Sequence, residues 1–256
     1  MGNVSRALQL VLETMVFMKT RLLTLTFMLG CLALLPLAQA GEIDDVKQAL
    51  LKNLPNASDA EVKKSEIPGL YQVMAGTQVL YVDKNARYAI QGDIYDLKTH
   101  QNLTESSRNS IRKKEIDALG EKNMVVYTPK GKVKHTVTVV TDIYCPYCRK
   151  LHSEMSKYLA DGIKVRYVFA PFKGQKSVDA SISVLCAKNR DKAMDMAKAG
   201  EPIEKKTCDS PIKKHQQLVQ ELGVRGTPAI ILENGYLNPG YMPEASLKKQ
   251  LVAMGL

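Results

Sequence analysis

The stretch HTVTVVTDIYCPYCRKLH, residues 135–152, decides the fold class of the C-terminal half of the chain. Its first part, up to Tyr144, is apolar and rich in β-branched side chains, which is the pattern of a strand buried on both faces. From Cys145 onward, apolar residues recur at helical spacing, beginning with Leu151. We therefore expect a strand-to-helix junction at Cys145, with Cys148 one helical turn deeper on the same face.

This junction gives the two cysteines unequal chemistry. A helix N-terminus offers unpaired N–H groups and a partial positive charge, so the pKa of the Cys145 thiol should lie well below its usual value of roughly 8.5. Pro146 suits the first helical turn because it has no N–H to leave unpaired. We predict that Cys145 attacks a substrate disulfide and that Cys148, which is shielded from large partners, resolves the mixed disulfide. Asp142 is either a buried proton acceptor for Cys148 or a surface residue at the strand end.

Other uses of two cysteines at this spacing fit the sequence less well. Haem attachment requires a histidine directly after the second cysteine, where this chain has Arg149. A structural zinc site requires four ligands, and no second C-x-x-C or H-x-x-x-H motif is present. His152 could supply a third ligand, but its position four residues after Cys148 is more typical of a helix surface. A static disulfide in so small a loop would constrain the unfolded chain little. We expect neither a metal nor a cofactor.

The stretch GVRGTPAII, residues 223–231, is the second signal. Pro228 stands directly before a β-type run, where proline is awkward for a buried strand, and this favours a cis Thr227–Pro228 bond in a tight turn. An ordinary loop proline is the alternative. Beside the cysteine pair, the turn would leave backbone groups near Thr227 free to pair with an extended substrate. Tyr147 is a candidate substrate contact, although a tyrosine there could simply cap the site.

The N-terminus resembles an export signal. Lys19 and Arg21 precede an apolar run that ends in Ala38-Gln39-Ala40, which predicts a secretory signal peptide over residues 1–40 with cleavage after Ala40. Translation from Met18 would leave residues 1–17 as an untranslated extension. Two alternatives are an uncut membrane anchor, since the run is nearly long enough to span a bilayer, and lipidation of Cys31 in the sequence MLGC. Cleavage would leave an even number of cysteines in an oxidising compartment, which implies disulfides.

The charge pattern argues against a nucleic-acid partner. The full sequence has a formal net charge of +10, but its lysines are scattered in ones and twos, with no dense basic stripe interleaved with aromatic residues. Such a distribution is typical of a solvated protein surface.

Three segments follow the signal. Residues 41–101 contain one amphipathic helix, 43–54, and about four short β-type pieces, which predicts a small α+β domain. Because this core is thin, a second copy of the domain is expected to complete it. Residues 102–122 are polar with few apolar residues, which predicts an exposed linker helix. Residues 123–256 show an α/β pattern: strands at 135–144 and 163–172, largely helical residues 178–222, a hairpin from 228 to 241, and a last helix at 244–254.

Together, TDIYCPYCRKLH, GTPAIIL and NPGY resemble the bacterial disulfide isomerases DsbC and DsbG, and the resemblance covers residues 41–256. It implies a V-shaped homodimer joined through the N-terminal domains. It also implies a C-terminal thioredoxin-like domain with a helical insertion that faces an apolar cleft. Cys145 matches the family's nucleophile, Cys148 its resolving cysteine, and Thr227-Pro228 its cis-proline loop.

One dipeptide and one cysteine pair complete the comparison. Pro146-Tyr147 resembles the dipeptide of DsbG, whereas DsbC typically has Gly-Tyr, and these two residues tune the redox chemistry of the pair. By the resemblance, Cys186 and Cys208 form a structural disulfide, which would contribute roughly 3 kcal/mol on the chain-entropy model. A second redox pair is the alternative.

The resemblance implies a periplasmic disulfide isomerase and reductase with chaperone activity. Its substrates would be misoxidised or unfolded exported proteins, and a DsbD-like membrane thiol reductant would keep the cysteine pair reduced. The alternatives are a DsbG-like reductase of single oxidised cysteines, a dithiol oxidase, and a protein that acts mainly as a holdase chaperone.

Overall fold

The structure is a computed structural model that describes residues 35–256, with side chains from Gly41 onward. The predicted signal peptide therefore lies outside the described residues, except that the backbone of 35–40 belongs to the first described helix. Met18 and Cys31 also lie outside them. Among the residues described, no helix is both long and apolar enough to cross a membrane.

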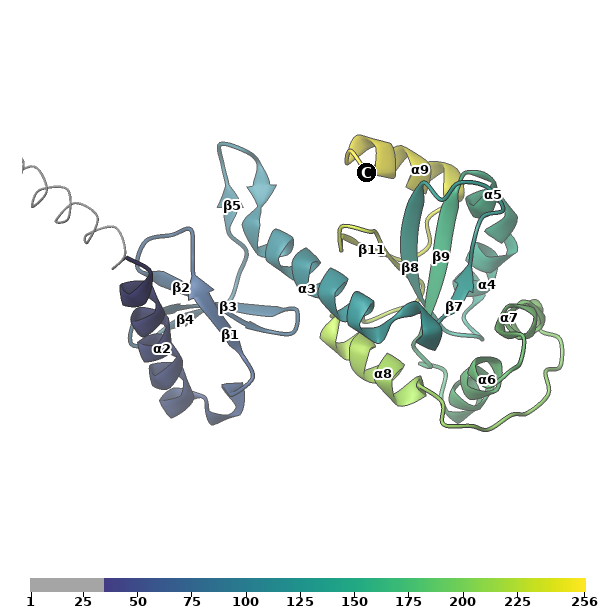
Figure 1. Ribbon diagram of the computed structural model, residues 1–256, viewed down its shortest axis with the longest axis horizontal. Coiled ribbons are helices and arrows are strands. Elements are labelled where there is room, and N and C mark those ends of the chain that lie inside the picture. The colour runs from purple at the N-terminus through teal and green to yellow at the C-terminus, as the bar shows by residue number, and fades with distance from the viewer. Residues whose placement is uncertain (1–34) are drawn as a thin grey trace, which may run out of the picture. The chain divides into compact units, whose positions relative to one another are not determined.

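The described chain forms two compact units, and each is treated by itself. One comprises residues 35–73 and 81–90, and the other comprises Met74–Leu80 and Gln91–Leu256. The N-terminal elements form a four-stranded sheet in the order β1-β2-β3-β4 and one long helix, and a two-stranded β5-β6 ribbon follows them in the part of the chain that belongs to the second unit (Figure 1). Their bounds are α2 Leu35–Asn53, η1 Pro55–Ala57, β1 Glu61–Lys64, β2 Leu70–Ala75, β3 Gln78–Asp83, β4 Ala89–Ile90, β5 Tyr95–Asp96 and β6 Gln101–Asn102.

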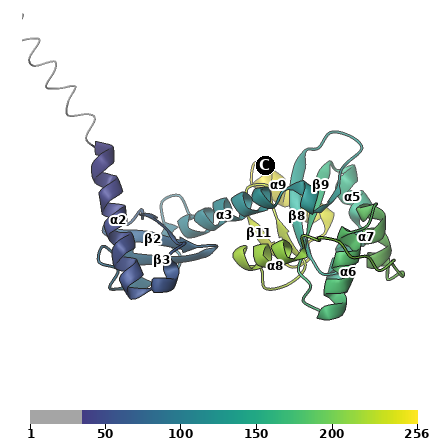
Figure 2. The same ribbon diagram turned by 60° about the horizontal axis from the view of Figure 1, so that its bottom comes forward.

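The second unit contains a five-stranded sheet in the order β11-β10-β8-β9-β7. The central pair, β8 and β9, is parallel, whereas β10 joins β8 and β7 joins β9 in antiparallel fashion. Helices lie on both faces of this sheet (Figure 2). The bounds are α3 Leu103–Leu119, η2 Glu121–Asn123, β7 Val125–Tyr127, β8 His135–Thr141, α4 Pro146–Ser153, α5 Met155–Ala160, β9 Ile163–Phe169, α6 Gln175–Leu185, α7 Arg190–Ala199, α8 Ile212–Glu221, β10 Ala229–Ile231, β11 Leu237–Pro239 and α9 Glu244–Ala253.

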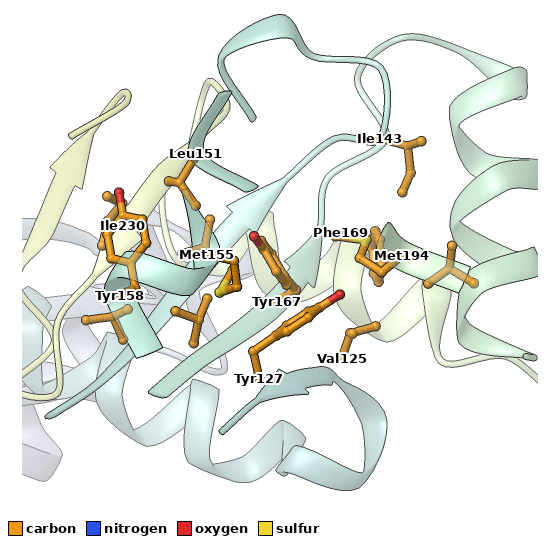
Figure 3. Close-up of a cluster of buried hydrophobic side chains, with 14 of the residues drawn as sticks. Val125, Tyr127, Ile143, Leu151, Met155, Tyr158, Tyr167, Phe169, Met194 and Ile230 are labelled. Atoms are coloured by element: carbon orange, nitrogen blue, oxygen red, sulfur yellow. The ribbon is translucent and has the colours of Figure 1, made fainter. Parts of the chain in front are cut away.

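Neighbouring residues of the central strands serve two different cores. Val139 and Tyr167 belong to the larger core, which α4 to α7 and α9 cover and part of which, including Tyr167, is drawn in Figure 3. Val140 and Val168 belong to a second core on the opposite face. This alternation follows from the two-residue period of a strand. It explains why successive residues of β8, from Val137 to Thr141, are all buried: both faces of the strand are covered.

The linker helix differs from its prediction. The sequence predicted an exposed helix, but α3 buries Ile116 and Leu119 in the second core, where they join Leu218 and Leu222 from α8 and the loop after it. Figure 1 shows the C-terminal part of α3 beside α8. Two apolar side chains of α3 are enough because α8 covers the rest of that face of the sheet.

One helical prediction is confirmed and another requires correction. The region expected to be largely helical, residues 178–222, contains the three helices α6, α7 and α8, with a non-helical segment between α7 and α8. The helix that follows the cysteine pair is interrupted at Glu154, where α4 ends and α5 begins. Both interruptions allow the chain to wrap around the sheet, which one straight helix could not do.

Candidate active site

The two cysteines of the CPYC motif lie where β8 leads into α4. Cys145 is the residue that caps the N-terminus of α4, and its carbonyl accepts a hydrogen bond from the Arg149 N–H at 3.0 Å. Both thiols are free, with 6 % of Cys145 and 1 % of Cys148 exposed. Pro146 is the first residue of the helix, where its missing N–H leaves no donor unpaired.

The environment of Cys145 favours its thiolate. Burial opposes ionisation, but hydrogen bonds from the backbone N–H groups of Cys148 and Tyr147 and from the side chain of Thr227 outweigh it and lower the pKa of the Cys145 thiol. The N–H groups are unpaired donors of the first turn of α4. In its protonated form, the Cys145 sulfur donates to the carbonyl oxygen of Thr227 at 3.2 Å.

The environment of Cys148 has the opposite net effect. Burial raises the pKa of the Cys148 thiol, although the positive charge of Lys198, the Thr141 hydroxyl and the Asp142 N–H partly offset it. The surroundings therefore favour the thiolate form at Cys145 and the protonated thiol at Cys148.

The loop before β10 lies beside this pair. The Thr227–Pro228 peptide bond is cis, and the Thr227 carbonyl is the group that contacts Cys145. A hollow of about 360 Å³ adjoins the loop, lined by residues 223–229 together with Leu237, Pro239 and Gly240. The structure thus brings Cys145, Cys148, Thr227 and Pro228 together from positions far apart in the sequence.

Tyr147 is the most exposed member of the motif. It exposes 62 % of its surface, and its ring stacks on that of Tyr241, with 6.3 Å between the ring centroids. The Lys150 ammonium lies over the ring of Tyr241, 4.7 Å from its centroid. Tyr147 is therefore accessible to a bound substrate.

Asp142 and His152 are both buried, which corrects two expectations. Asp142 is fully buried, and its carboxylate accepts the N–H groups of Tyr144 and Lys173 at 2.8 and 3.0 Å. The surface alternative for Asp142 is therefore wrong. His152, expected on the helix surface, lies in the core, where its ring nitrogens contact the Tyr167 hydroxyl and the Asp195 carboxylate, each at 3.0 Å. Helical spacing alone could not show that α7 covers this side of α4.

Lys198 is a residue at this site that the sequence did not indicate. It lies near the end of α7, exposes 4 % of its surface, and its Nζ donates to Thr141 Oγ1 at 2.7 Å and to the Asp142 carbonyl at 2.8 Å. In the sequence it stands in a polar, lysine-rich segment, so no local pattern distinguishes it from a surface lysine. Only the packing of α7 against α4 brings it to Cys148.

Cys186 and Cys208 are bonded to each other and not to the cysteines of the CPYC motif. The structure joins them in a disulfide with Cα atoms 5.7 Å apart. Cys186 caps the C-terminus of α6, and Cys208 belongs to the non-helical segment before α8. The bridge therefore holds that segment against α6.

The fold and the free cysteine pair define a class. A five-stranded sheet covered by helices on both faces, with a C-x-x-C motif opening a helix beside a cis-proline loop, is a thioredoxin-type dithiol oxidoreductase. Within residues 35–256, no three His, Cys, Asp or Glu side chains are grouped so that they could hold a metal ion.

Comparison with known proteins gives the family. Residues 121–255 match a thioredoxin-like domain, and residues 37–105 match the disulfide bond isomerase protein N-terminal domain. The thiol:disulfide interchange protein DsbC of Dickeya dadantii is 40 % identical over 232 residues, which is 89 % of this chain and 92 % of that protein. DsbC of Escherichia coli K12 is 38 % identical over 209 residues, or 80 % of this chain and 86 % of the relative. A disulfide interchange protein from Neisseria gonorrhoeae has a TM-score of 0.47 and 24 % identity, covering 52 % of this chain and 96 % of that one.

The chain belongs to the DsbC family. This confirms the predicted α+β fold with its two matched domains and the predicted enzyme class, a periplasmic thiol:disulfide isomerase or oxidoreductase. Membership also supports the predicted homodimer, because the N-terminal domain of the family is present.

Proposed function

We propose that the chain rearranges incorrect disulfides in exported proteins, with Cys145 as the nucleophile and Cys148 as the resolving cysteine. The observation that carries this assignment is the unequal environment of the two thiols: the surroundings lower the pKa of Cys145 and raise that of Cys148. The thiolate is the attacking form, so attack falls to Cys145.

The reaction then has two outcomes. The Cys145 thiolate attacks a client disulfide, forms a mixed disulfide and releases one client sulfur as a thiolate. If that thiolate attacks another client disulfide, the client is rearranged, and a client thiolate finally displaces Cys145. If Cys148 attacks Cys145 first, the enzyme becomes oxidised and the client leaves reduced. A membrane thiol reductant of the DsbD kind would then return the pair to its dithiol form.

The hollow beside Thr227 is the proposed seat of the client segment around its disulfide. It adjoins the Cys145 sulfur through the Thr227 carbonyl, and residues 223–229 provide backbone groups along its wall. Tyr147 is the proposed aromatic contact for the client because it is exposed two residues after the nucleophile. Pro146 and Tyr147 remain the proposed tuning residues of the pair.

We also propose how the chain is processed and organised: signal cleavage after Ala40, a dimerising domain at 41–101, a linker at 102–122 and a catalytic domain at 123–256. The short strand β4 lies at a sheet edge, and its residue Ile90 and the preceding Tyr88 are exposed, which suits pairing with a second copy. Sedimentation of the processed chain should show a dimer, and an Ile90→Lys variant should shift it toward the monomer. A wild-type monomer at all concentrations would contradict the homodimer.

Refolding of scrambled ribonuclease tests the activity. The reduced protein should restore ribonuclease activity faster than a small thiol that supplies the same number of thiols. If it does not, the isomerase proposal fails. Thiol trapping in cells then separates the alternatives, since a resting dithiol fits an isomerase or reductase and a resting disulfide fits an oxidase. Suppression of aggregation by a chain that lacks both CPYC thiols would instead show a holdase activity independent of them.

A further inference from the structure

The contacts of Lys198 are unusual for a lysine. Its ammonium is almost fully buried and donates to two neutral oxygens, Thr141 Oγ1 and the Asp142 carbonyl. Across the described chain, residues 35–256, it forms no ion pair with a carboxylate. A buried ammonium without a paired anion is costly, and a methionine would fill similar space without that cost.

Burial also changes the acid–base behaviour of this side chain. It lowers the pKa of Lys198 to about 8, although the negative charges that form on Cys148, Asp142 and Cys145 act in the opposite direction. The amine can therefore exchange a proton close to neutral pH, which an ordinary surface lysine does not do. Its surroundings are the reacting thiols of the site.

Thr141 connects Lys198 to the resolving cysteine. Its hydroxyl oxygen accepts from Lys198 Nζ at 2.7 Å, and the interaction of its side chain with the Cys148 sulfur lowers the pKa of that thiol. The hydroxyl is therefore placed between the amine and the sulfur. Because a hydroxyl both donates and accepts, it can pass a proton from one end to the other.

Other groups near Lys198 are arranged differently. The carboxylate of Asp142 is occupied by two backbone N–H groups, which leaves its carbonyl for Lys198. From α6, Lys176 lies over the Tyr144 ring and Asp179 binds Gln175. The titratable groups that interact with Lys198 come from α4 and from the residue after β8: Cys145, Cys148, Arg149, His152 and Asp142. Two tyrosines lie one contact further away: Tyr167 of β9 binds His152, and Tyr127 of β7 binds Asp195, which also binds His152.

We infer that Lys198 is a positioning residue for the resolving step: through the Thr141 hydroxyl, it accepts the proton that Cys148 must lose before it attacks the mixed disulfide. This role rests on the resolving function proposed for Cys148. The two cysteines belong to the N-terminal part of α4, whereas the proton acceptor proposed for Cys148 comes from α7.

The step balances without any outside reactant. The Cys148 S–H bond breaks, and a new N–H bond forms on the neutral Lys198 amine, with the Thr141 hydroxyl exchanging one proton for another. The Cys148 thiolate then forms a bond to the Cys145 sulfur. The bond from Cys145 to the client sulfur breaks, and its electron pair leaves on the client as a thiolate. When the disulfide is reduced again, Lys198 returns the proton to Cys148.

Stopped-flow kinetics with 5,5′-dithiobis(2-nitrobenzoate) can resolve the two steps in the reduced full chain. Attack by Cys145 releases a first thionitrobenzoate, and attack by Cys148 on the mixed disulfide releases a second. We expect Lys198→Met to slow the second release at pH 7 by about 100-fold, at the lower end of the range of general base catalysis, and the first by less than about threefold. Thr141→Val should slow the same phase.

Two variants make this test specific. Lys192→Met makes the same change on an exposed part of α7 and should alter neither phase. Lys198→Arg keeps a positive charge but cannot release a proton near neutral pH, so it should be as slow in the second phase as Lys198→Met. A fast second phase in Lys198→Arg would show that only a fixed charge is needed, and that result would overturn proton transfer. An unchanged second phase in Lys198→Met would also overturn the inference.

A measurement on the unaltered protein covers the case in which these variants fail to fold. NMR titration of 13C-labelled lysine should show Lys198 titrating near pH 8 in the reduced form and at lower pH in the oxidised form, where Cys148 cannot become an anion. A Lys198 amine that titrates with ordinary lysines in both forms would refute the role. Absence of the first release in wild type would instead contradict the proposed function of Cys145.

Discussion

The protein contains two cysteine pairs that differ in almost every physical respect. Cys145 and Cys148 are free thiols at a helix N-terminus, surrounded by N–H donors, a hydroxyl and a buried ammonium. Cys186 and Cys208 are joined in a disulfide that links the end of α6 to a non-helical segment. Cysteine sulfur atoms of one domain are therefore free thiols in the first pair and disulfide-bonded in the second. What differs is whether the surroundings stabilise a thiolate.

The largest effect should come from removing the sulfur that attacks. Cys145→Ser should reduce ribonuclease isomerisation to the level of the uncatalysed control, because a serine hydroxyl stays protonated where a thiol ionises. Cys148→Ser should still attack but should accumulate mixed disulfides that appear on non-reducing gels. If Cys145→Ser forms such adducts and Cys148→Ser does not, the two roles are reversed.

Removing the second pair should affect stability and leave chemistry intact. A Cys186→Ala/Cys208→Ala variant should lose roughly 3 kcal/mol in the free energy of unfolding, as expected for a loop of this length. The separation of the two cysteines is 22 residues. Urea denaturation measures the loss, and isomerase activity at a temperature where the variant is folded should match wild type. Activity that disappears from a folded variant would identify a second redox pair.

Acid should act on the scaffold through His215 of α8. Its Nδ1 accepts the Phe169 N–H at 3.0 Å, and its Nε2 lies 2.7 Å from the Asn123 carbonyl. Burial lowers the pKa of His215 to about 4. The unfolded chain binds this proton below about pH 6.5, whereas the folded chain resists it, so the contribution is complete above pH 6.5 and is lost as the pH falls toward 4.

The expected loss over that interval is roughly 2–3 kcal/mol. Urea denaturation from pH 7 to pH 4 should show a shallower decline for His215→Asn, in which an amide oxygen can still accept the Phe169 N–H. His100→Asn is the matched control, because His100 is exposed and asparagine tolerates its positive φ of 58°. An identical decline in all three proteins would exclude His215 as the cause.

The smallest effect should appear in selective alkylation of the reduced CPYC pair. Surroundings that lower the pKa of Cys145 keep its thiolate present at pH values where an ordinary thiol is protonated, while Cys148 remains a thiol to higher pH. At pH 6, iodoacetamide should therefore modify Cys145 at least about tenfold faster than Cys148. Peptide mapping by mass spectrometry measures the ratio. Equal rates would mean that the two environments do not differ in solution.

Several parts of the fold were predictable because their physical causes are local. The β-branched run before Cys145 specifies a doubly covered strand, and Pro146 is compatible only with the start of the helix that follows. The position of Cys145 at the helix N-terminus follows from those two facts. Its lowered pKa then depends on backbone groups that every helix N-terminus has.

Other parts were not predictable from residue patterns. Leu119 of α3 appears in a polar segment, yet it is buried because α8 covers the same face of the sheet. His152 has the spacing of a surface residue, but α7 covers it. The break between α4 and α5 at Glu154 contains no proline or glycine that would have predicted it.

The sequence by itself predicted that Cys145 attacks and Cys148 follows, because a cysteine at the start of a helix and another one turn later differ in their access to backbone N–H groups. The tertiary structure alone decided what surrounds the second sulfur. Lys198 lies far from Cys148 along the chain, and its ammonium reaches Thr141 only because α7 packs against α4. Burial and charge depend on all neighbours at once, so a single lysine in a polar helix carries no local sign of its place beside the reacting thiols.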